Sequence, residues 1–193
     1  MDIVDVHRRT VEAWQGSVGA VAADQWASPT PCTDWSVREL VNHVVGEELW
    51  MVPLLQGSTI EEIGDRFDGD VLGEDPAGAA RSASAAALAV AHDRLPAGGK
   101  VNLSYGKEDA AEYAWQLAAD HLIHRWDLAV STGQDPTMDA DLVTAVAGWF
   151  SEREQMYREG GAIGPRVETT DDDAQTTLLA AFGRSAGWTS RST

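Results

Sequence analysis

The feature of the sequence that most constrains the fold is a long helical pattern from Asp109 to Thr132. Apolar side chains recur there at the spacing of one face of an α-helix, and the pattern is the longest in the chain. Gly133 follows it directly and Pro136 stands just beyond, which is typical of a helix end, because glycine accepts the left-handed conformation and proline cannot continue a helix. The sequence therefore predicts a long helix over 109–132.

Further helices are predicted on both sides of this segment. Ser36 and Glu39 have the S-x-x-E spacing with which two side chains satisfy free backbone amides at a helix start. Asp75 and Pro76 supply a cap followed by proline at the first helical position. Together with amphipathic patterns and an acidic run that favours a helix N-terminus, these signals predict helices at about 2–24, 36–54, 76–95, 139–158 and 173–184.

The segments between these helices contain little that could form a sheet. Residues 57–73 are predicted to form a loop with one short helix. Residues 96–106 alternate like a strand, but one strand alone cannot form a sheet, so we interpret the segment as a connection. The sequence thus predicts an all-α fold, a helical bundle with long crossover connections, and a single domain over residues 1–193.

The charge balance excludes several classes of partner. The chain has 31 acidic side chains against 14 Lys or Arg, which gives a formal net charge of −17. Such an excess of carboxylates repels phosphate, so neither nucleic acid nor an anionic membrane is an expected partner. The N-terminus lacks the apolar core of a signal peptide, no stretch is apolar enough to span a bilayer, and the single cysteine fits a reducing compartment. We expect a cytoplasmic protein, either a monomer or a homodimer.

Two ionisable residues interrupt the apolar face of the long helix. Tyr113, Leu117, Asp120, His124 and Leu128 stack on one side of it because they are three or four residues apart. Burying a lone carboxylate costs several kcal/mol, and the usual remedies are a cation, hydrogen bonds or a metal ion. The helix contains no lysine, and its only arginine projects from another side. This pattern makes the carboxylate and the imidazole candidates for chemistry.

The pair Asp120 and His124 has the spacing with which a helix presents two ligands to one metal ion. A third ligand has to come from another helix, and the candidate is His43, which lies on the inward side of the helix over 36–54. Two imidazoles and one carboxylate leave positions open for water or substrate, as in a reactive metal site.

Simpler or different interpretations exist for each of these residues. A buried histidine often bonds only to the backbone, and an Asp-x-x-x-His pair is often a simple ion pair. His121 could replace Asp120 as a ligand through an H-x-x-H pair. Glu47 could join the ligands or bond an imidazole from behind, although a solvated face is its simpler interpretation. Asp127, one turn after His124, has the same option of bonding the imidazole.

Three segments resemble a known family. The string PCTDWSVRELVNHVVGEE resembles the segment that opens the second helix of mycothiol-dependent maleylpyruvate isomerase-like proteins, which belong to the DinB-like metalloprotein superfamily. DHLIHRWDLAVSTG resembles a later segment of the same proteins, and LLAAFGR is similar to their short closing motif. The three segments occur in the family's order and together span most of the chain.

The resemblance implies a DinB-like four-helix bundle, here with an extra C-terminal helical segment, that binds a divalent metal ion, commonly zinc or nickel. The positions that hold the metal in the family match His43, Asp120 and His124 of this sequence, with aspartate where characterised members have glutamate. This match ranks His121 below Asp120 as a ligand.

The resemblance also implies an activity. It suggests a transferase or isomerase that activates a small thiol, with mycothiol as cosubstrate, and adds it to a small electrophile. An anionic electrophile would need an arginine in the pocket, for which Arg184 and Arg125 are candidates.

Two alternatives to this activity stay open. The chain could bind a divalent metal without catalysis, in a structural or sensor role, or it could be a metal-free bundle whose polar residues pair with one another. Cys32, just ahead of the second predicted helix, is interpreted as a small apolar residue of a loop rather than as a reactive thiol.

Overall fold

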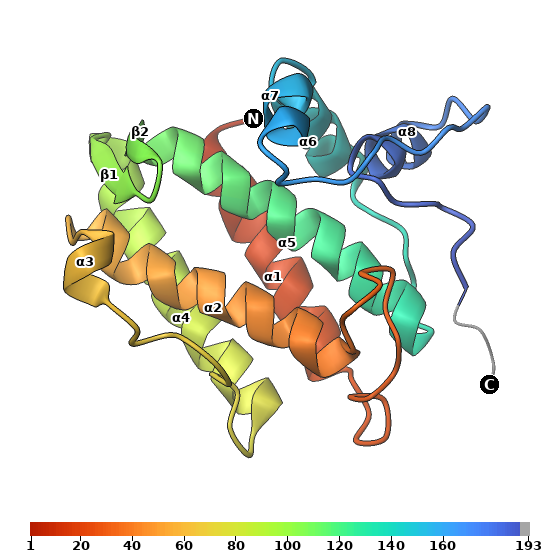
Figure 1. Ribbon diagram of the computed structural model, residues 1–193, viewed down its shortest axis with the longest axis horizontal. Coiled ribbons are helices and arrows are strands. Elements are labelled where there is room, and N and C mark those ends of the chain that lie inside the picture. Colours follow the sequence, from red (N-terminus) through yellow and green to blue (C-terminus); the bar gives the residue numbers. More distant parts are fainter. Residues whose placement is uncertain (190–193) are drawn as a thin grey trace.

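Four long helices form the body of the protein in the computed structural model, which describes residues 1–189 (Figure 1). The helices run side by side and bury their apolar faces against one another, which confirms the predicted all-α bundle. They are α1 (Ile3–Gly19), α2 (Val37–Leu55), α4 (Pro76–Arg94) and α5 (Ala110–Thr132).

The ends of these helices follow the local sequence. Ser36 and Glu39 form the predicted capping box, in which each side chain accepts a hydrogen bond from the backbone amide of the other. Asp75 caps α4 ahead of the proline at its first position. Gly133 ends α5 with a φ of 71°, in the left-handed region that favours glycine. Only α1 departs from its predicted bounds by several residues, because it ends at Gly19 rather than near residue 24.

The interpretation of residues 96–106 as a plain connection is wrong. Strand β1 (Lys100–Leu103) pairs antiparallel with β2 (Gly106–Asp109), with Val101 opposite Glu108. The partner strand was missed because its charged side chains show no apolar alternation. Between α2 and the hairpin lie the short helix α3 (Ile60–Ile63) and the 3₁₀ turn η1 (Leu95–Ala97).

The C-terminal part of the chain adds three short helices on the side of α5 that faces away from α2 (Figure 1). The helix predicted over 139–158 is interrupted, and its two parts are α6 (Ala140–Ser151) and α7 (Glu154–Glu159). At the break, Arg153 turns back to α5 and donates two hydrogen bonds to Glu112, at 2.6 and 2.9 Å. The last helix, α8 (Ala174–Ala181), completes the predicted C-terminal helical segment.

A buried polar cluster lies in the centre of the bundle, with one member from each long helix. His121 Nε2 on α5 lies 3.0 Å from Glu48 Oε1 on α2, and Ser84 on α4 donates to the same oxygen at 2.7 Å. His7 on α1 is fully buried beside them, with its ring centroid 6.0 Å from that of His121. Neither ring nitrogen of His7 makes a hydrogen bond with the described residues. His121 thus belongs to the core.

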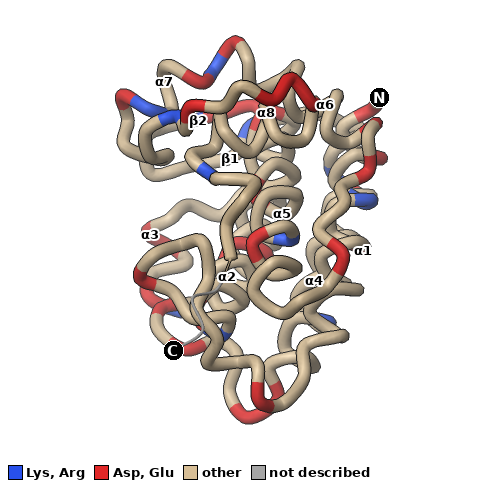
Figure 2. Tube along the Cα trace, turned by 90° about the vertical axis from the view of Figure 1, so that its right-hand side faces the viewer, with Lys and Arg blue, Asp and Glu red and all other residues tan. Residues whose placement is uncertain are grey.

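Acidic residues are spread along the whole molecule, and basic ones are fewer (Figure 2). Several of the basic groups are paired with carboxylates, as Arg9 is with Asp139 at 2.6 Å. Among residues 1–189, no helix combines the length and the apolar character needed to cross a bilayer.

Candidate metal centre

A cavity of about 590 Å³ lies between the middle of α2, the middle of α5 and the C-terminal segment. One end of it is polar and contains the three ligands predicted from the sequence. The other end is apolar and mostly aromatic. The loop ahead of α2 and the residues that follow α8 complete the wall.

The structure brings His43, Asp120 and His124 together at the polar end, with one donor atom of each within 4.8 Å of the others. His43 Nε2 lies 3.3 Å from Asp120 Oδ2, and His124 Nε2 lies 3.2 Å from Asp120 Oδ1. The two imidazole rings meet edge to face at a centroid distance of 5.2 Å. Their nitrogens therefore flank one carboxylate from both sides.

This donor set fits a divalent metal ion in its chemistry and its spacing. Ligands about 2.1 Å from a tetrahedral zinc ion lie about 3.4 Å from one another, close to the two separations above. Asp120 Oδ2 is buried and makes no hydrogen bond with the described residues, although His43 Nε2 lies 3.3 Å away. A buried carboxylate oxygen without a hydrogen bond is costly unless a cation balances it.

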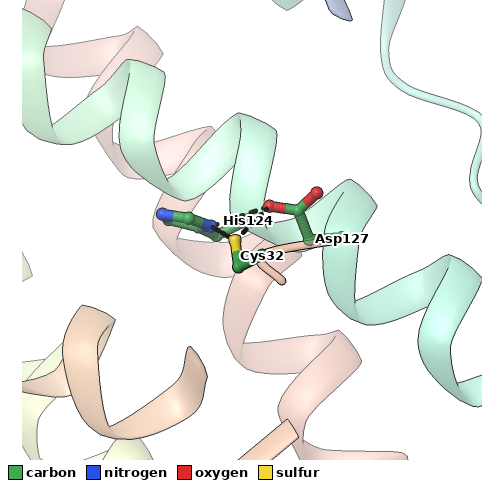
Figure 3. A group of neighbouring side chains, drawn as sticks. All are labelled: Cys32, His124 and Asp127. Carbon is green, nitrogen blue, oxygen red and sulfur yellow. Dashed lines mark hydrogen bonds and ion pairs between the residues drawn. The ribbon is translucent and has the colours of Figure 1, made fainter. Parts of the chain in front are cut away.

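Asp127 holds His124 from behind, as Figure 3 shows. Its Oδ2 lies 2.9 Å from Nδ1 of the imidazole, which in that arrangement carries the proton and donates it. The other ring nitrogen, Nε2, points the opposite way, toward Asp120. When the imidazole is neutral, this hydrogen bond keeps the remaining proton on Nδ1, so that the lone pair is on Nε2.

Arg184 connects this pair to the C-terminal segment and to the loop ahead of α2. Its Nη2 donates to Asp127 Oδ2 at 2.8 Å and to Cys32 Sγ at 3.1 Å, and its Nε donates to Asp127 Oδ1 at 3.1 Å. Cys32 Sγ lies 4.0 Å from His124 Nδ1, on the same side of the ring as Asp127 (Figure 3). Cys32 is therefore part of a polar cluster, which its interpretation as an apolar loop residue missed.

Charges within the site shift the pKa values of its members. Burial alone would raise the pKa of Asp120, but the adjacent His124 and His43 outweigh it and hold this pKa well below its usual range. Burial would likewise lower the pKa of His124, but Asp120 and the hydrogen bond to Asp127 outweigh it and raise this pKa well above its usual value. The site favours a charged carboxylate.

Three further residues were considered from the sequence. The expectation that Glu47 faces solvent is wrong, because its half-buried side chain lines the cavity, where burial and the charge of Asp120 raise its pKa. His121 lies in the core with Glu48, away from the other candidate ligands. Arg125 does not line the cavity, and its Nη1 donates to the carbonyl oxygen of Thr137 at 2.7 Å.

Part of the cavity wall is aromatic, and sequence reasoning did not predict which rings form it. Trp35 lies over His43 with ring centroids 4.8 Å apart, and its indole also approaches His124 at 6.0 Å. At the other end of the cavity, Trp149 stacks on Trp115 at 6.1 Å and approaches Tyr157 at 5.9 Å. The eight tryptophans of the sequence indicate many buried aromatic rings but not which of them share a cavity.

Comparison with known proteins agrees with this geometry. The family profile described as mycothiol maleylpyruvate isomerase N-terminal domain matches residues 7–129, which contain all three candidate ligands. Two relatives from Mycobacterium tuberculosis, uncharacterized protein Rv0738 of strain H37Rv and uncharacterized protein MT0763 of strain CDC 1551, are each 34% identical over 146 residues. These matches cover 74% of this chain and 74% of each relative.

No solved structure gives a significant match to the chain. The family match spans well over half of the sequence, and the observed helical bundle is of the DinB-like type that the family implies. The same family is of a metal-binding type, in keeping with the groups of metal-ligating side chains around His124. The chain therefore belongs to the mycothiol maleylpyruvate isomerase N-terminal domain family.

Proposed function

We propose that the protein is a metal-dependent transferase or isomerase that adds a small thiol, mycothiol, to a small electrophile. In this proposal His43, Asp120 and His124 hold the metal ion, zinc or nickel, at the polar end of the cavity. The thiol and the electrophile occupy the remaining space, and no side chain has to act as the nucleophile.

One observation carries the proposal. Asp120 presents a buried oxygen without a hydrogen bond between two imidazole nitrogens, inside a cavity large enough for small molecules. The core pair of Glu48 and His121 also leaves one carboxylate oxygen without a hydrogen bond, but Glu48 does not line the cavity. At Asp120 the unsatisfied oxygen belongs to a residue of the cavity wall, where a ligand can reach it. Membership in a mycothiol-related family supports a thiol as the partner molecule.

The residues of the chain have separate roles in this chemistry. A bound divalent ion favours the thiolate form of a thiol and withdraws electrons from a carbonyl group. Asp127 keeps the proton on Nδ1 of His124, so that Nε2 is available as a ligand. Arg184 holds Asp127 in place from the other side, and Trp35 covers one face of His43.

The test is turnover by the metal-loaded protein. Zinc- or nickel-loaded protein is mixed with mycothiol and a panel of electrophiles, and loss of the free thiol is followed against metal-free protein. We expect turnover in the wild type and in His92→Ala, which removes an exposed histidine of α4, but not in His124→Ala. Absence of turnover above the metal-free protein with every electrophile would contradict the proposal.

A second candidate function is divalent-metal binding without catalysis, in a structural or sensor role. It is favoured by the position of the donors on two different helices, because an ion held by His43 of α2 and by Asp120 and His124 of α5 would cross-link the bundle. This function predicts a large fall in melting temperature when a chelator removes the ion, together with no loss of thiol in the turnover assay. Detection of thiol transfer excludes it.

A further inference from the structure

We propose that the electrophile is an uncharged aromatic molecule and not a carboxylate. This inference rests on the proposed function and names the substrate class that the cavity accepts. It follows from the charged groups at the polar end and from the side chains at the apolar end.

The cavity has no free cation for a substrate carboxylate. Among the described residues, Arg184 is the only Lys or Arg that lines it. Its Nε donates to both oxygens of Asp127, and its Nη2 donates to Asp127 Oδ2. Its Nη1 donates to the carbonyl oxygen of Phe182 at 3.0 Å. A further hydrogen bond runs from Nη2 to Cys32 Sγ. The guanidinium charge is therefore matched by Asp127, and most of its N–H groups are already used.

Another arginine lies close to the apolar end but is neutralised in the same way. Arg153 is stacked over the Trp149 ring at 5.2 Å, behind the cavity wall. Its Nε and Nη2 donate to both oxygens of Glu112. A bound carboxylate would have to compete with Glu112 for it.

Apart from Arg184 and the two histidines proposed as metal ligands, the charged groups that face the cavity are acidic. Glu47 and Asp120 both line it, from α2 and from α5. The two charges of a divalent ion would be matched by Asp120 and by the thiolate, so the ion would leave no net positive charge for the electrophile. Ionised Glu47 would repel a carboxylate placed beside it in a partly desolvated space, where charges are weakly screened, and protonated Glu47 would offer it no positive charge.

The apolar end offers flat surfaces for a ring. Tyr113, Trp149 and Phe182 are nearly fully buried and present part of their surface to the cavity, and Tyr157 is half-buried beside them. Aromatic side chains prefer stacked or edge-to-face contact with another ring. An aromatic electrophile bound there has its reactive carbon directed to the polar end, where the thiol sulfur would attack.

A chloronitrobenzene illustrates the reaction. The mycothiol sulfur attacks the ring carbon that bears chlorine, and a carbon–sulfur bond forms. The carbon–chlorine bond then breaks, chloride leaves with the bonding electron pair, and the thiol proton passes to water. The step needs neither an oxidant nor a reductant.

The experiment compares matched neutral and anionic electrophiles. Metal-loaded protein and mycothiol are mixed with 1-chloro-2,4-dinitrobenzene or with 4-chloro-3,5-dinitrobenzoate, and each rate is divided by the rate without protein. We expect the neutral compound to be accelerated at least tenfold more than the carboxylate, and also more than the neutral aliphatic iodoacetamide. Equal or greater acceleration of the carboxylate would overturn the inference.

A pair of variants tests the role of the acidic wall. Glu47→Gln removes a charge from the cavity, and we expect it to reduce the preference for the neutral compound at least twofold. Glu61→Gln removes the same charge from an exposed position of α3 and should leave the preference unchanged. If Glu47→Gln behaves like Glu61→Gln, the acidic wall does not select the substrate and the inference fails.

A binding measurement separates this inference from the proposed function. Titration calorimetry compares unreactive 1,3-dinitrobenzene with 3,5-dinitrobenzoate in the presence of mycothiol. If no electrophile is turned over but the neutral compound binds at least tenfold more tightly, the proposed function fails and the assignment of the cavity stands. If turnover occurs but the carboxylate binds as tightly, the assignment of the cavity fails and the proposed function stands.

Discussion

Replacing His7 by leucine should remove most of one acid-sensitive contribution to stability. His7 is fully buried in α1, and burial together with the charge of His121 lowers its pKa from 6.5 to about 3. Leucine is similar in size and has no nitrogen that would need a hydrogen bond. The substitution therefore tests whether this core histidine stays neutral in the folded protein.

The sign follows from where the proton binds. Between pH 6.5 and about pH 3, His7 binds a proton in the unfolded chain but not in the folded protein. Protonation therefore favours the unfolded chain, and the free energy of unfolding decreases as the pH falls from 6.5 toward 3. At pH 5 the pKa difference corresponds to about 2 kcal/mol, from about 1.4 kcal/mol for each of roughly 1.5 pH units. The free energy of unfolding of His7→Leu should lack this pH-dependent decrease.

The assay is urea unfolding of metal-free protein at pH 7 and pH 5, followed by tryptophan fluorescence. The free energy of unfolding of the wild type should fall by about 2 kcal/mol more than that of His7→Leu over this interval. His92→Leu, which changes an exposed histidine of α4, should follow the wild type. Parallel losses in wild type and His7→Leu would refute the reasoning, because they would mean that folded His7 accepts the proton.

Three further predictions concern other parts of the structure. Asp127→Asn removes the acceptor for the Nδ1 proton of His124, so affinity for zinc should fall about 10- to 100-fold in a chelator competition, and unchanged affinity would contradict this role. Glu112→Gln weakens the paired contact with Arg153 and should lower the free energy of unfolding by about 1 to 2 kcal/mol in urea, whereas an unchanged midpoint would mean that the contact is weak. Gly133→Ala places a β-carbon at a φ of 71° and should cost about 1 kcal/mol, a fall of about 2–4 °C in Tm by circular dichroism, and an equal Tm would disprove it.

Local signals predicted the helices well because they act within a few residues. The capping box at Ser36 and the glycine after Thr132 set helix ends through contacts with neighbouring backbone, and both are observed. The break after Ser151 was not predicted. It is accompanied by the contact of Arg153 with Glu112, which lies 41 residues earlier in the chain, and no neighbouring glycine or proline announces it.

In the candidate site, too, contacts within one helix could be predicted and contacts between distant residues could not. Asp120, His124 and Asp127 could be grouped from helical spacing alone, and the structure brings them close together with His43. The contact between Arg184 and Cys32 joins residues 152 positions apart, and only the folded chain reveals it.

The orientation of Glu47 was also beyond local reasoning, because it depends on how α2 is rotated against α5. Whether the grouped residues bind a metal stays a prediction.

Adjacent residues on α2 and α5 face in opposite directions, and this arrangement limits how the cavity can move. Glu47 and Asp120 line the cavity, whereas their neighbours Glu48 and His121 meet in the core. Rotating α2 away from α5 would therefore separate the buried Glu48 carboxyl group from His121, and a buried polar group without a partner is costly. The contact between Glu48 and His121 thus holds α2 and α5 at a fixed distance on the core side of the cavity. Movements that admit a ligand are therefore expected in the loop ahead of α2 and in the C-terminal segment, which form the rest of the wall.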